Sequence, residues 1–211
     1  MIKAVIFDID GVLIDSLKAN HKLFRSLLKE AGYKKLPTLL EYKKFFHLTA
    51  VDTFKELTGA KEKEINKLMQ MLHGLKRSAS SIKITPGSVA AIKKIAKNYR
   101  LALVTSRIEA GVEHYLEVTK TKTFFEVIVH YGHYKNPKPH PEPLLLACKR
   151  LKIKPEETVY IGDTHTDIAA ARAANMKVIL YPKTKLVGAT AYALKFSDIP
   201  KIVSLMNKGK I

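Results

Sequence analysis

Short apolar segments alternate with amphipathic ones through the second half of the chain, and this alternation restricts the fold more than any other feature. The apolar segments are typical of buried strands, and the segments between them have helical spacing. Strands that alternate with helices form a parallel sheet with helices on both faces. The expected helices are residues 89–97, 112–119, 143–151, 168–175 and 198–206, the last capped by Ser197, and the expected strands are 101–104, 127–129, 159–161 and 178–180, with 192–196 at the sheet edge.

The segment between the first strand, residues 4–7, and this alternation shows helical spacing only. Residues 17–31 and 61–76 each carry apolar side chains at intervals of three and four. Thr38 and Thr49 are each followed three residues later by an acid, which is the pattern of a capping box at the start of a helix. This part of the chain is therefore predicted to be all-helical.

The domain organisation follows from these two patterns. A serine-rich cluster at 78–81 and Pro86-Gly87 mark a linker that returns the chain to the sheet. We expect a doubly wound, Rossmann-like α/β core domain of residues 1–15 and 82–211, with a small all-helical cap domain of residues 16–81 inserted after the first strand. Ligands of such sheets bind beyond the carboxyl ends of the strands. The insertion leaves from that end, so the cap should lie over the site.

Charge and cysteine content limit the classes of partner. The net charge is +18, from 37 Lys and Arg against 19 Asp and Glu, but the excess is spread along the chain and no nucleic-acid motif accompanies it. We therefore favour a solvated basic surface or a general attraction for phosphate over nucleic-acid binding. The single cysteine, Cys148, excludes an internal disulfide, and no apolar stretch is long enough to cross a membrane. These features favour a cytoplasmic protein.

The first strand ends at two acids. Asp8 and Asp10 flank Ile9, which can face the core while both carboxylates face outward, and Gly11 allows a tight turn. Two carboxylates so close repel each other, so a fold that keeps both pairs them with a cation or lets one hold a proton. The same letters also occur in ordinary turns and helix caps, so this motif alone does not decide the function.

Two later segments offer groups that suit phosphate. Thr105 and Ser106 follow a strand and present hydroxyls and backbone amides that suit phosphate, although taken alone they fit a cap for a helix before Glu109 better. Lys138 lies between prolines in the sequence Asn-Pro-Lys-Pro-His-Pro, which restricts its loop. A restricted ammonium suits a phosphoryl group, and a solvated loop lysine is the alternative.

The predicted strand at 159–161, like the first strand, ends at acidic residues. It runs into Gly162-Asp163, and Asp167 follows four residues later at the start of a helix. Asp163 can ligate a cation, while Asp167 can cap the helix or orient its neighbours. Oxygen ligands of this kind suit Mg²⁺, and no cluster of Cys and His has the spacing of a zinc site.

Together these motifs resemble the haloacid dehalogenase-like hydrolase superfamily, in its phosphatase branch with a helical cap, which includes phosphoglycolate phosphatases and β-phosphoglucomutases. The motifs that carry the resemblance are Asp8-x-Asp10-Gly11, Thr105, Lys138 and Gly162-Asp163-x-x-x-Asp167. The resemblance implies a magnesium-dependent phosphatase that hydrolyses a small anionic phosphate monoester through a phospho-aspartate intermediate on Asp8.

The resemblance also implies a role for each residue. Asp8 would be the nucleophile and Asp10 the general acid and base. Mg²⁺ would be held by Asp8, the Asp10 backbone carbonyl and Asp163, with Asp167 behind them. The phosphoryl group would be bound by Thr105, Ser106 and Lys138.

Two other functions remain as alternatives, and the substrate stays open. A sugar phosphomutase would share the phospho-aspartate, although this chain has Asn20 where β-phosphoglucomutases carry a cap histidine, with His21 one place later. A non-catalytic binder of nucleic acid or protein would have little use for two crowded acids. The candidates for contact with the leaving group are Asn20, His21, Lys43, Lys44 and Arg107, and the sequence fixes neither the phosphate ester nor the oligomeric state.

Overall fold

A parallel sheet forms the centre of the protein. A computed structural model describes residues 1–75 and 82–211, and in this part of the chain the sheet has six strands in the order β3-β2-β1-β4-β5-β6. All neighbouring strands pair in parallel. The strands are β1 (Ala4–Phe7), β2 (Arg100–Val104), β3 (Val127–Val129), β4 (Thr158–Gly162), β5 (Lys177–Leu180) and β6 (Ala191–Tyr192).

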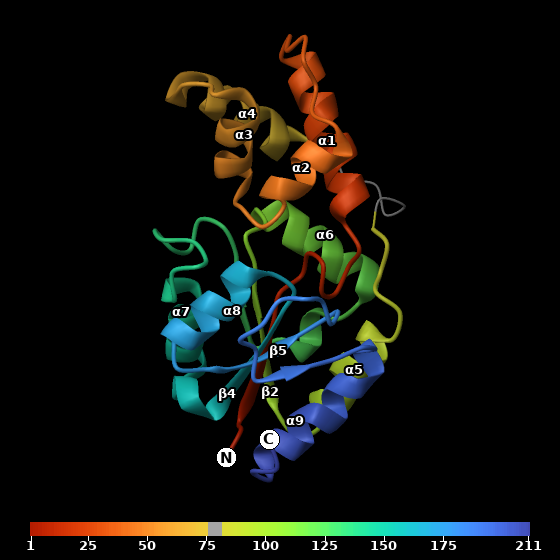
Figure 1. Ribbon diagram of the computed structural model, residues 1–211, viewed down its shortest axis with the longest axis vertical. Coiled ribbons are helices and arrows are strands. Elements are labelled where there is room, and N and C mark those ends of the chain that lie inside the picture. Colours follow the sequence, from red (N-terminus) through yellow and green to blue (C-terminus); the bar gives the residue numbers. More distant parts are fainter. Residues whose placement is uncertain (76–81) are drawn as a thin grey trace.

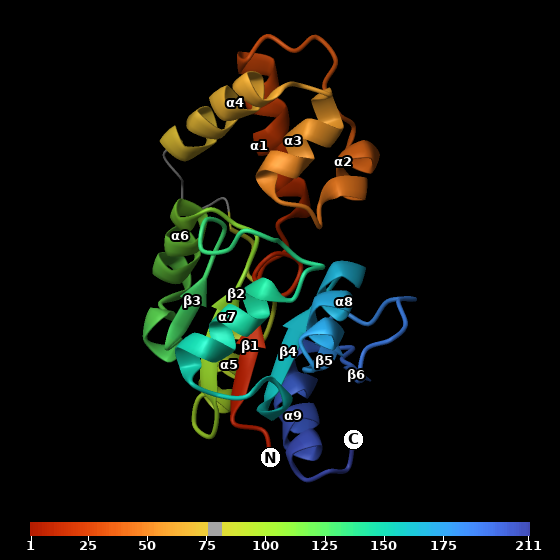
Figure 2. The same cartoon turned by 90° about the vertical axis from the view of Figure 1, so that its left-hand side faces the viewer.

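Helices cover both faces of the sheet, as Figures 1 and 2 show. Successive residues of β1 point to opposite faces: Val5 and Phe7 pack in one apolar cluster, and Ala4 and Ile6 pack in the other. The first cluster takes side chains from α5 (Ser88–Ile95), α6 (Glu109–Thr119) and α9 (Ile199–Asn207), and the second from α7 (Glu142–Leu151) and α8 (His165–Ala173). This architecture confirms the predicted Rossmann-like α/β class.

Four helices form a separate layer over one end of the sheet, while both chain termini lie at the other end (Figure 1). They are α1 (Leu17–Glu30), α2 (Leu39–Phe45), α3 (Ala50–Thr58) and α4 (Glu62–Gly74). Their buried apolar side chains make a cluster of their own, into which Ile108 from the core also packs. The domain boundary at 81 remains a prediction, and the predicted serine-rich linker lies outside the described residues.

The two connections between the helical layer and the sheet run side by side. Ile14 pairs with Ile84 in an antiparallel bridge. The amide of Asp15 donates to the carbonyl of Lys83 at 2.9 Å, and the amide of Thr85 donates to the carbonyl of Leu13 at 3.0 Å. The helical layer is therefore attached to the sheet by two chain segments that hydrogen-bond to each other.

Helices α6 and α8 each begin three residues earlier than predicted, and the last helix has a different cap. Helix α6 begins at Glu109 instead of residue 112. Helix α8 begins at His165 instead of residue 168, because the Thr164 side chain accepts from the Asp167 amide and caps the first turn. The Ser197 cap of the last helix was wrong. Ser197 lies inside a 3₁₀ turn, Phe196–Asp198, and α9 follows with Asp198 at the N-cap and no side-chain cap bond. The Asp198 carboxylate instead accepts from the Lys195 amide.

Three further 3₁₀ and strand features complete the chain. Short 3₁₀ helices occupy Lys122–Phe124 and Pro155–Glu157. The edge strand is Ala191–Tyr192, shorter and earlier than the predicted 192–196, because Phe196 turns inward and is buried against the first cluster.

Candidate active site

Polar side chains converge where β1, β2 and β4 end, beneath the helical layer. Asp8 follows β1, Thr105 follows β2, and Asp163 follows β4. Because β2, β1 and β4 are neighbours in the sheet, their carboxyl ends bring these residues together. A cavity lies between this edge and the helical layer, and it is lined by residues of both, including Asp8, Asp10, Thr105, Lys138 and Asp163.

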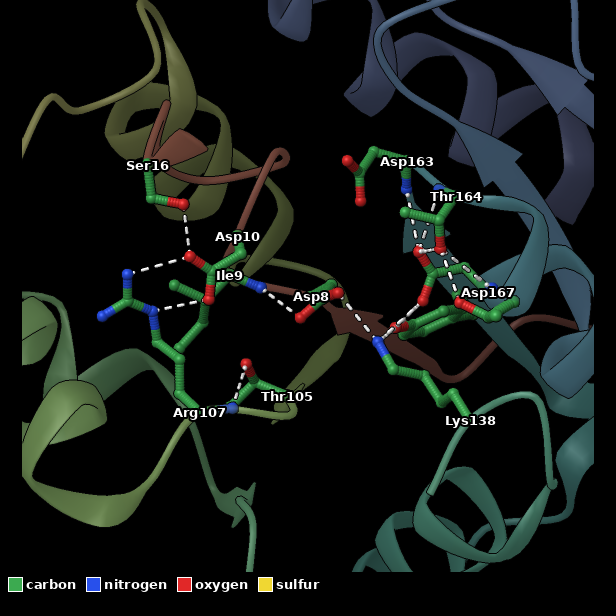
Figure 3. A network of polar contacts seen from close by, with 12 residues as sticks. Asp8, Ile9, Asp10, Ser16, Thr105, Arg107, Lys138, Asp163, Thr164 and Asp167 are labelled. Carbon is green, nitrogen blue, oxygen red and sulfur yellow. Dashed lines mark hydrogen bonds and ion pairs between the residues drawn. The ribbon is translucent and has the colours of Figure 1, made fainter. Parts of the chain in front are cut away.

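Lys138 lies between two carboxylates (Figure 3). Its Nζ donates to Asp8 Oδ2 at 2.8 Å, to Asp167 Oδ1 at 2.7 Å and to the Tyr160 hydroxyl at 2.9 Å. The side chain is only 5% exposed. Burial alone would lower the pKa of Lys138, but the carboxylates of Asp167 and Asp8 outweigh it and raise that pKa well above its usual range. The lysine is therefore a fixed buried cation beside Asp8.

Asp8 is held in an environment that resists its ionisation. Burial raises its pKa to about 6, the charge of Lys138 opposes this rise, and the charge of Asp167 adds to it. Asp8 Oδ2 is bonded to Lys138, and Oδ1 accepts from the Ile9 amide at 2.7 Å. A further positive charge at this carboxylate would favour its ionised form.

Asp167 fixes its neighbours. Besides Lys138, its Oδ1 accepts from the Tyr160 hydroxyl at 2.9 Å. Its Oδ2 accepts from the amides of Asp163 and Thr164 at 3.1 and 3.0 Å, and from the Thr164 hydroxyl at 2.6 Å. These bonds occupy both oxygens, so Asp167 orients the loop after β4 and the lysine.

Asp163 differs from Asp167 in that its carboxylate accepts no hydrogen bond from any described residue. In Figure 3 the dashed line at Asp163 reaches its backbone amide and none reaches its carboxylate. Gly11 allows it to approach closely, because a Cβ at that position would lie 2.0 Å from Asp163 Oδ2. Burial, with the charges of Asp167 and Asp8, raises the pKa of Asp163 well above its usual range. Carboxylate oxygens that accept no hydrogen bond, in a buried position beside other acids, suit a cation.

The acids fit a divalent metal on these grounds. One carboxylate oxygen from each of Asp8, Asp163 and Asp167 lies within 4.8 Å of the others. Asp167 Oδ1 accepts two hydrogen bonds and its Oδ2 accepts three, whereas each Asp8 oxygen accepts only one. Asp8 and Asp163 are therefore the two acids that keep lone pairs for an ion. All donors are carboxylate oxygens, which suit Mg²⁺ better than zinc.

Asp10 points away from the lysine, toward Arg107 (Figure 3). Arg107 Nε donates to Asp10 Oδ2 at 2.6 Å and Nη2 donates to Oδ1 at 2.8 Å. The Ser16 hydroxyl and Asn20 Nδ2 also donate to Oδ1, the latter at 3.1 Å. Burial would raise the pKa of Asp10, but Arg107, Ser16 and Asn20 outweigh it and lower that pKa.

The hydroxyls after β2 line the cavity. Thr105 is buried, and its Oγ1 accepts from the Arg107 amide at 3.2 Å. It does not cap α6, whose N-cap is Ile108 without a side-chain bond. Ser106 lines the cavity beside Thr105. Of the two interpretations that the sequence left open for these hydroxyls, phosphate binding stays a prediction.

The candidates for contact with the leaving group separate into two groups. Asn20 and Arg107 line the cavity. His21 instead bonds to the Pro37 carbonyl at 2.9 Å, and Lys43 and Lys44 are exposed on α2, so these three are not among the lining residues.

Sequence reasoning missed several residues of the site. Tyr160 bonds to Lys138 and Asp167, and a hydroxyl within an apolar strand was the signal available for it. Tyr42 and His47 line the cavity from the helical layer, and Ser16 bonds to Asp10. No motif marks these three.

The fold and the site define a capped α/β enzyme with an acidic centre at the carboxyl edge of its sheet. A family model described as haloacid dehalogenase-like hydrolase matches residues 5–181, and the chain belongs to this family. The family confirms the resemblance drawn from the motifs.

Relatives match along nearly the whole chain. The chain is 30% identical over 223 residues to pyrophosphatase PpaX of Bacillus cereus, which covers 99% of each chain. It is 29% identical over 201 residues to phosphoglycolate phosphatase of Nitrosospira multiformis, covering 92% of this chain and 88% of the relative. A crystal structure from Bacteroides fragilis, described as a putative haloacid dehalogenase-like hydrolase, shares the fold with a TM-score of 0.84 at 23% identity, covering 94% of this chain and all of that one.

The helices of the described residues carry no membrane-spanning candidate, since none combines sufficient length with an apolar composition.

Proposed function

We propose that this phosphatase is a magnesium-dependent enzyme that hydrolyses a small anionic phosphate monoester through a phospho-aspartate on Asp8. The observation that carries the proposal is the position of Asp8 between the buried cation Lys138 and the open carboxylate of Asp163. The printed names of the relatives, a pyrophosphatase and a phosphoglycolate phosphatase, agree with a small anionic substrate.

In the proposed reaction, one Asp8 oxygen attacks phosphorus and forms an acyl phosphate as the bond from phosphorus to the alcohol oxygen breaks. Asp10, two residues on, gives a proton to the departing oxygen. Asp10 then takes a proton from water, whose oxygen attacks the same phosphorus and releases phosphate with Asp8 restored. Dividing the transfer in this way replaces one difficult step by two easier ones.

Positive charge and hydrogen-bond donors favour the transferring group. Lys138 is held rigidly at Asp8 Oδ2, so its ammonium lies beside the oxygen atoms that gain charge. Thr105 and Ser106 offer hydroxyls and amides from the end of β2. Phosphoryl transfer depends chiefly on such positioning and charge neutralisation.

Mg²⁺ would be held by Asp8, Asp163 and the backbone carbonyl of Asp10, with Asp167 orienting the loop behind them. When bound, the ion offsets the repulsion between the Asp8 carboxylate and the phosphoryl oxygens. The fit rests on the unpaired Asp163 carboxylate and on the raised pKa of both Asp8 and Asp163.

The same proposal includes a small-molecule phosphate ester as the partner and the reducing cytoplasm as the location. The single thiol, Cys148, is buried, which is compatible with such a compartment.

The test is phosphate release from a panel of metabolites that includes phosphoglycolate and pyrophosphate, with and without Mg²⁺. We expect metal-dependent release that Asp8→Asn abolishes. Asp198→Asn makes the same chemical change at an acid outside the cavity and should leave the rate unchanged. Interconversion of glucose phosphates without release would assign a mutase instead, and no turnover of either kind would assign a binder.

A further inference from the structure

The cavity holds a cation that the proposed reaction does not use. Among the described residues that line it, Arg107 and Lys138 are the permanent cations. The three N–H donors of Lys138 are all bonded, to Asp8, Asp167 and Tyr160. Arg107 lies on the other side of Asp8 from Lys138 (Figure 3), where it is bonded to Asp10, the acid proposed to protonate the leaving group.

Part of the Arg107 guanidinium has no partner. Nε and one Nη2 donor bond to Asp10, and Nη2 also lies 3.4 Å from Asn20 Oδ1. Nη1 donates to no described residue, although the side chain is only 11% exposed. A guanidinium presents five N–H donors in a planar fork, which matches the two oxygens of a carboxylate or phosphate.

A second donor without a partner lines the cavity near Arg107. Tyr42 of α2 is 3% exposed, and its hydroxyl makes no hydrogen bond within the described part of the chain. Burial raises the pKa of Tyr42, the charge of Asp10 raises it further and the charge of Arg107 lowers it, which places the phenol ring near both charges. The helical layer thus contributes the Tyr42 hydroxyl, and the core contributes the Arg107 guanidinium.

We propose that Arg107 and Tyr42 form a subsite for a second anionic group on the alcohol side of the substrate. The subsite takes a carboxylate or a second phosphate, so the substrate class is a small ester with two anionic ends. This proposal rests on the proposed function, since it assigns the leaving-group side of the same reaction.

The geometry gives the second anion an additional effect. Both oxygens of Asp10 are occupied by Arg107, with Ser16 and Asn20 also on Oδ1. An anion bound at Nη1 leaves the Nε and Nη2 bonds to Asp10 in place, but it neutralises part of the guanidinium charge and so weakens the hold of Arg107 on Asp10. Arg107 therefore positions Asp10 as well as selecting the substrate.

The experiment compares two matched pairs of esters. The carboxylate pair is phosphoglycolate and its carboxamide, and the phosphate pair is ethylene glycol bisphosphate and 2-hydroxyethyl phosphate. We expect kcat/KM to be about 10- to 100-fold higher for the doubly anionic member of one pair, the size of one charge-assisted hydrogen bond. The preferred pair identifies the anion as carboxylate or phosphate.

Variants separate selection from a structural role. Arg107→Gln should remove most of the preference by lowering kcat/KM for the anionic member, whereas a purely structural arginine would lower both members alike. Tyr42→Phe should reduce the preference in the same direction, and Arg107→Lys, which keeps the charge without the fork, should recover part of it. Arg100→Gln is the matched control, because Arg100 lies at the opposite end of β2 in an exposed pair with Glu126.

The outcomes distinguish this proposal from the proposed function. Equal kcat/KM within each pair for the native enzyme, with hydrolysis still abolished by Asp8→Asn, overturns the subsite and leaves the function intact. A preference that persists in Arg107→Gln also overturns it. No hydrolysis of any of the four esters, with release from other members of the metabolite panel, overturns the subsite alone. Hydrolysis that survives Asp8→Asn contradicts the proposed function and the subsite together. The comparison of kcat/KM within each pair of esters, made with the native enzyme, tests the subsite even if a variant does not fold.

Discussion

Lys138 Nζ lies 2.8 Å from Asp8 Oδ2 and 2.7 Å from Asp167 Oδ1, so one buried cation joins the carboxylates that follow β1 and that begin α8. These residues are separated by 130 and 29 positions in the chain. The contact therefore links the proposed nucleophile to the framework of the site, and removing it should affect both rate and stability.

Lys138→Met should lower kcat by about 10²- to 10³-fold, because the phosphoryl oxygens lose a preorganised positive charge. It should also lower the free energy of unfolding by about 3 to 5 kcal/mol, since it leaves buried carboxylates without their cation. Steady-state kinetics and denaturant unfolding measure the two effects. Lys83→Met, at a lysine in an exposed pair with Asp15, should change stability by about 0 to 1 kcal/mol. Equal effects of the two variants would contradict this role for Lys138.

Gly11→Ala tests the close approach to Asp163. The added Cβ would lie 2.0 Å from Asp163 Oδ2 at a residue with φ of +75°. Gly32→Ala is the control, because Gly32 has φ of +91° and nothing within 4 Å of the added Cβ. Both variants should lose about 1 to 2 kcal/mol of stability to backbone strain. Only Gly11→Ala should raise the Mg²⁺ concentration needed for half-maximal activity, and an unchanged metal requirement would argue against Asp163 as a ligand.

Asp163→Asn should have opposite effects with and without metal. The pKa of Asp163 is raised in the folded protein, so its ionised form is disfavoured there, and this cost grows as the pH rises above the pKa of the unfolded chain. Without metal at pH 7, the amide should therefore raise Tm. With Mg²⁺, the native protein should gain Tm by mass action and the variant should gain little. Thermal unfolding with and without Mg²⁺ measures this, and Asp198→Asn should behave as the native chain does.

His47→Gln should reduce the dependence of stability on pH. The rings of His47, from the helical layer, and His165, at the start of α8, lie with centroids 4.7 Å apart. Burial and the charge of His165 lower the pKa of His47, while Asp167 opposes this. The unfolded chain then binds more protons than the folded one, so stability is lost as the pH falls through the unfolded value near 6.5. Tm measured between pH 5 and 8 should fall less steeply in the variant. An identical slope of Tm against pH in the native protein and the variant would show that the His47–His165 pair does not contribute to the pH dependence of stability.

The sequence predicted those parts of the molecule that depend on local pattern. The carboxyl ends of parallel strands meet at one edge, so strand positions were sufficient to bring Asp8, Thr105 and Asp163 together. The start of α8 was also readable, since Thr164 and Asp167 form a capping box, but the apolar spacing drew the prediction to residue 168. Local capping chemistry was a better guide to that boundary than periodicity.

Other parts of the site depend on contacts that no local pattern encodes. The fork between Arg107 and Asp10 joins residues 97 positions apart, and it depends on how the loop after β2 packs beneath α1. Tyr42 reaches the cavity because of the packing of α2, while its neighbours Lys43 and Lys44 are exposed. Helical spacing cannot say which polar residue of a short helix turns toward a partner that lies outside it.

Asp8 should carry the phosphoryl group during turnover, and acid-quenched peptide mass spectrometry detects that group on the protein. The enzyme is mixed with Mg²⁺ and p-nitrophenyl phosphate, whose good leaving group needs little help from an acid, and quenched within one turnover. Asp10→Asn should accumulate the intermediate, because it cannot activate the water. We predict one phosphoryl group on the peptide that contains Asp8 in this variant, and none when Asp8→Asn is added. Phosphate release in the native enzyme with no phosphoryl group on Asp8 at any quench time, or release that survives Asp8→Asn, would contradict the account.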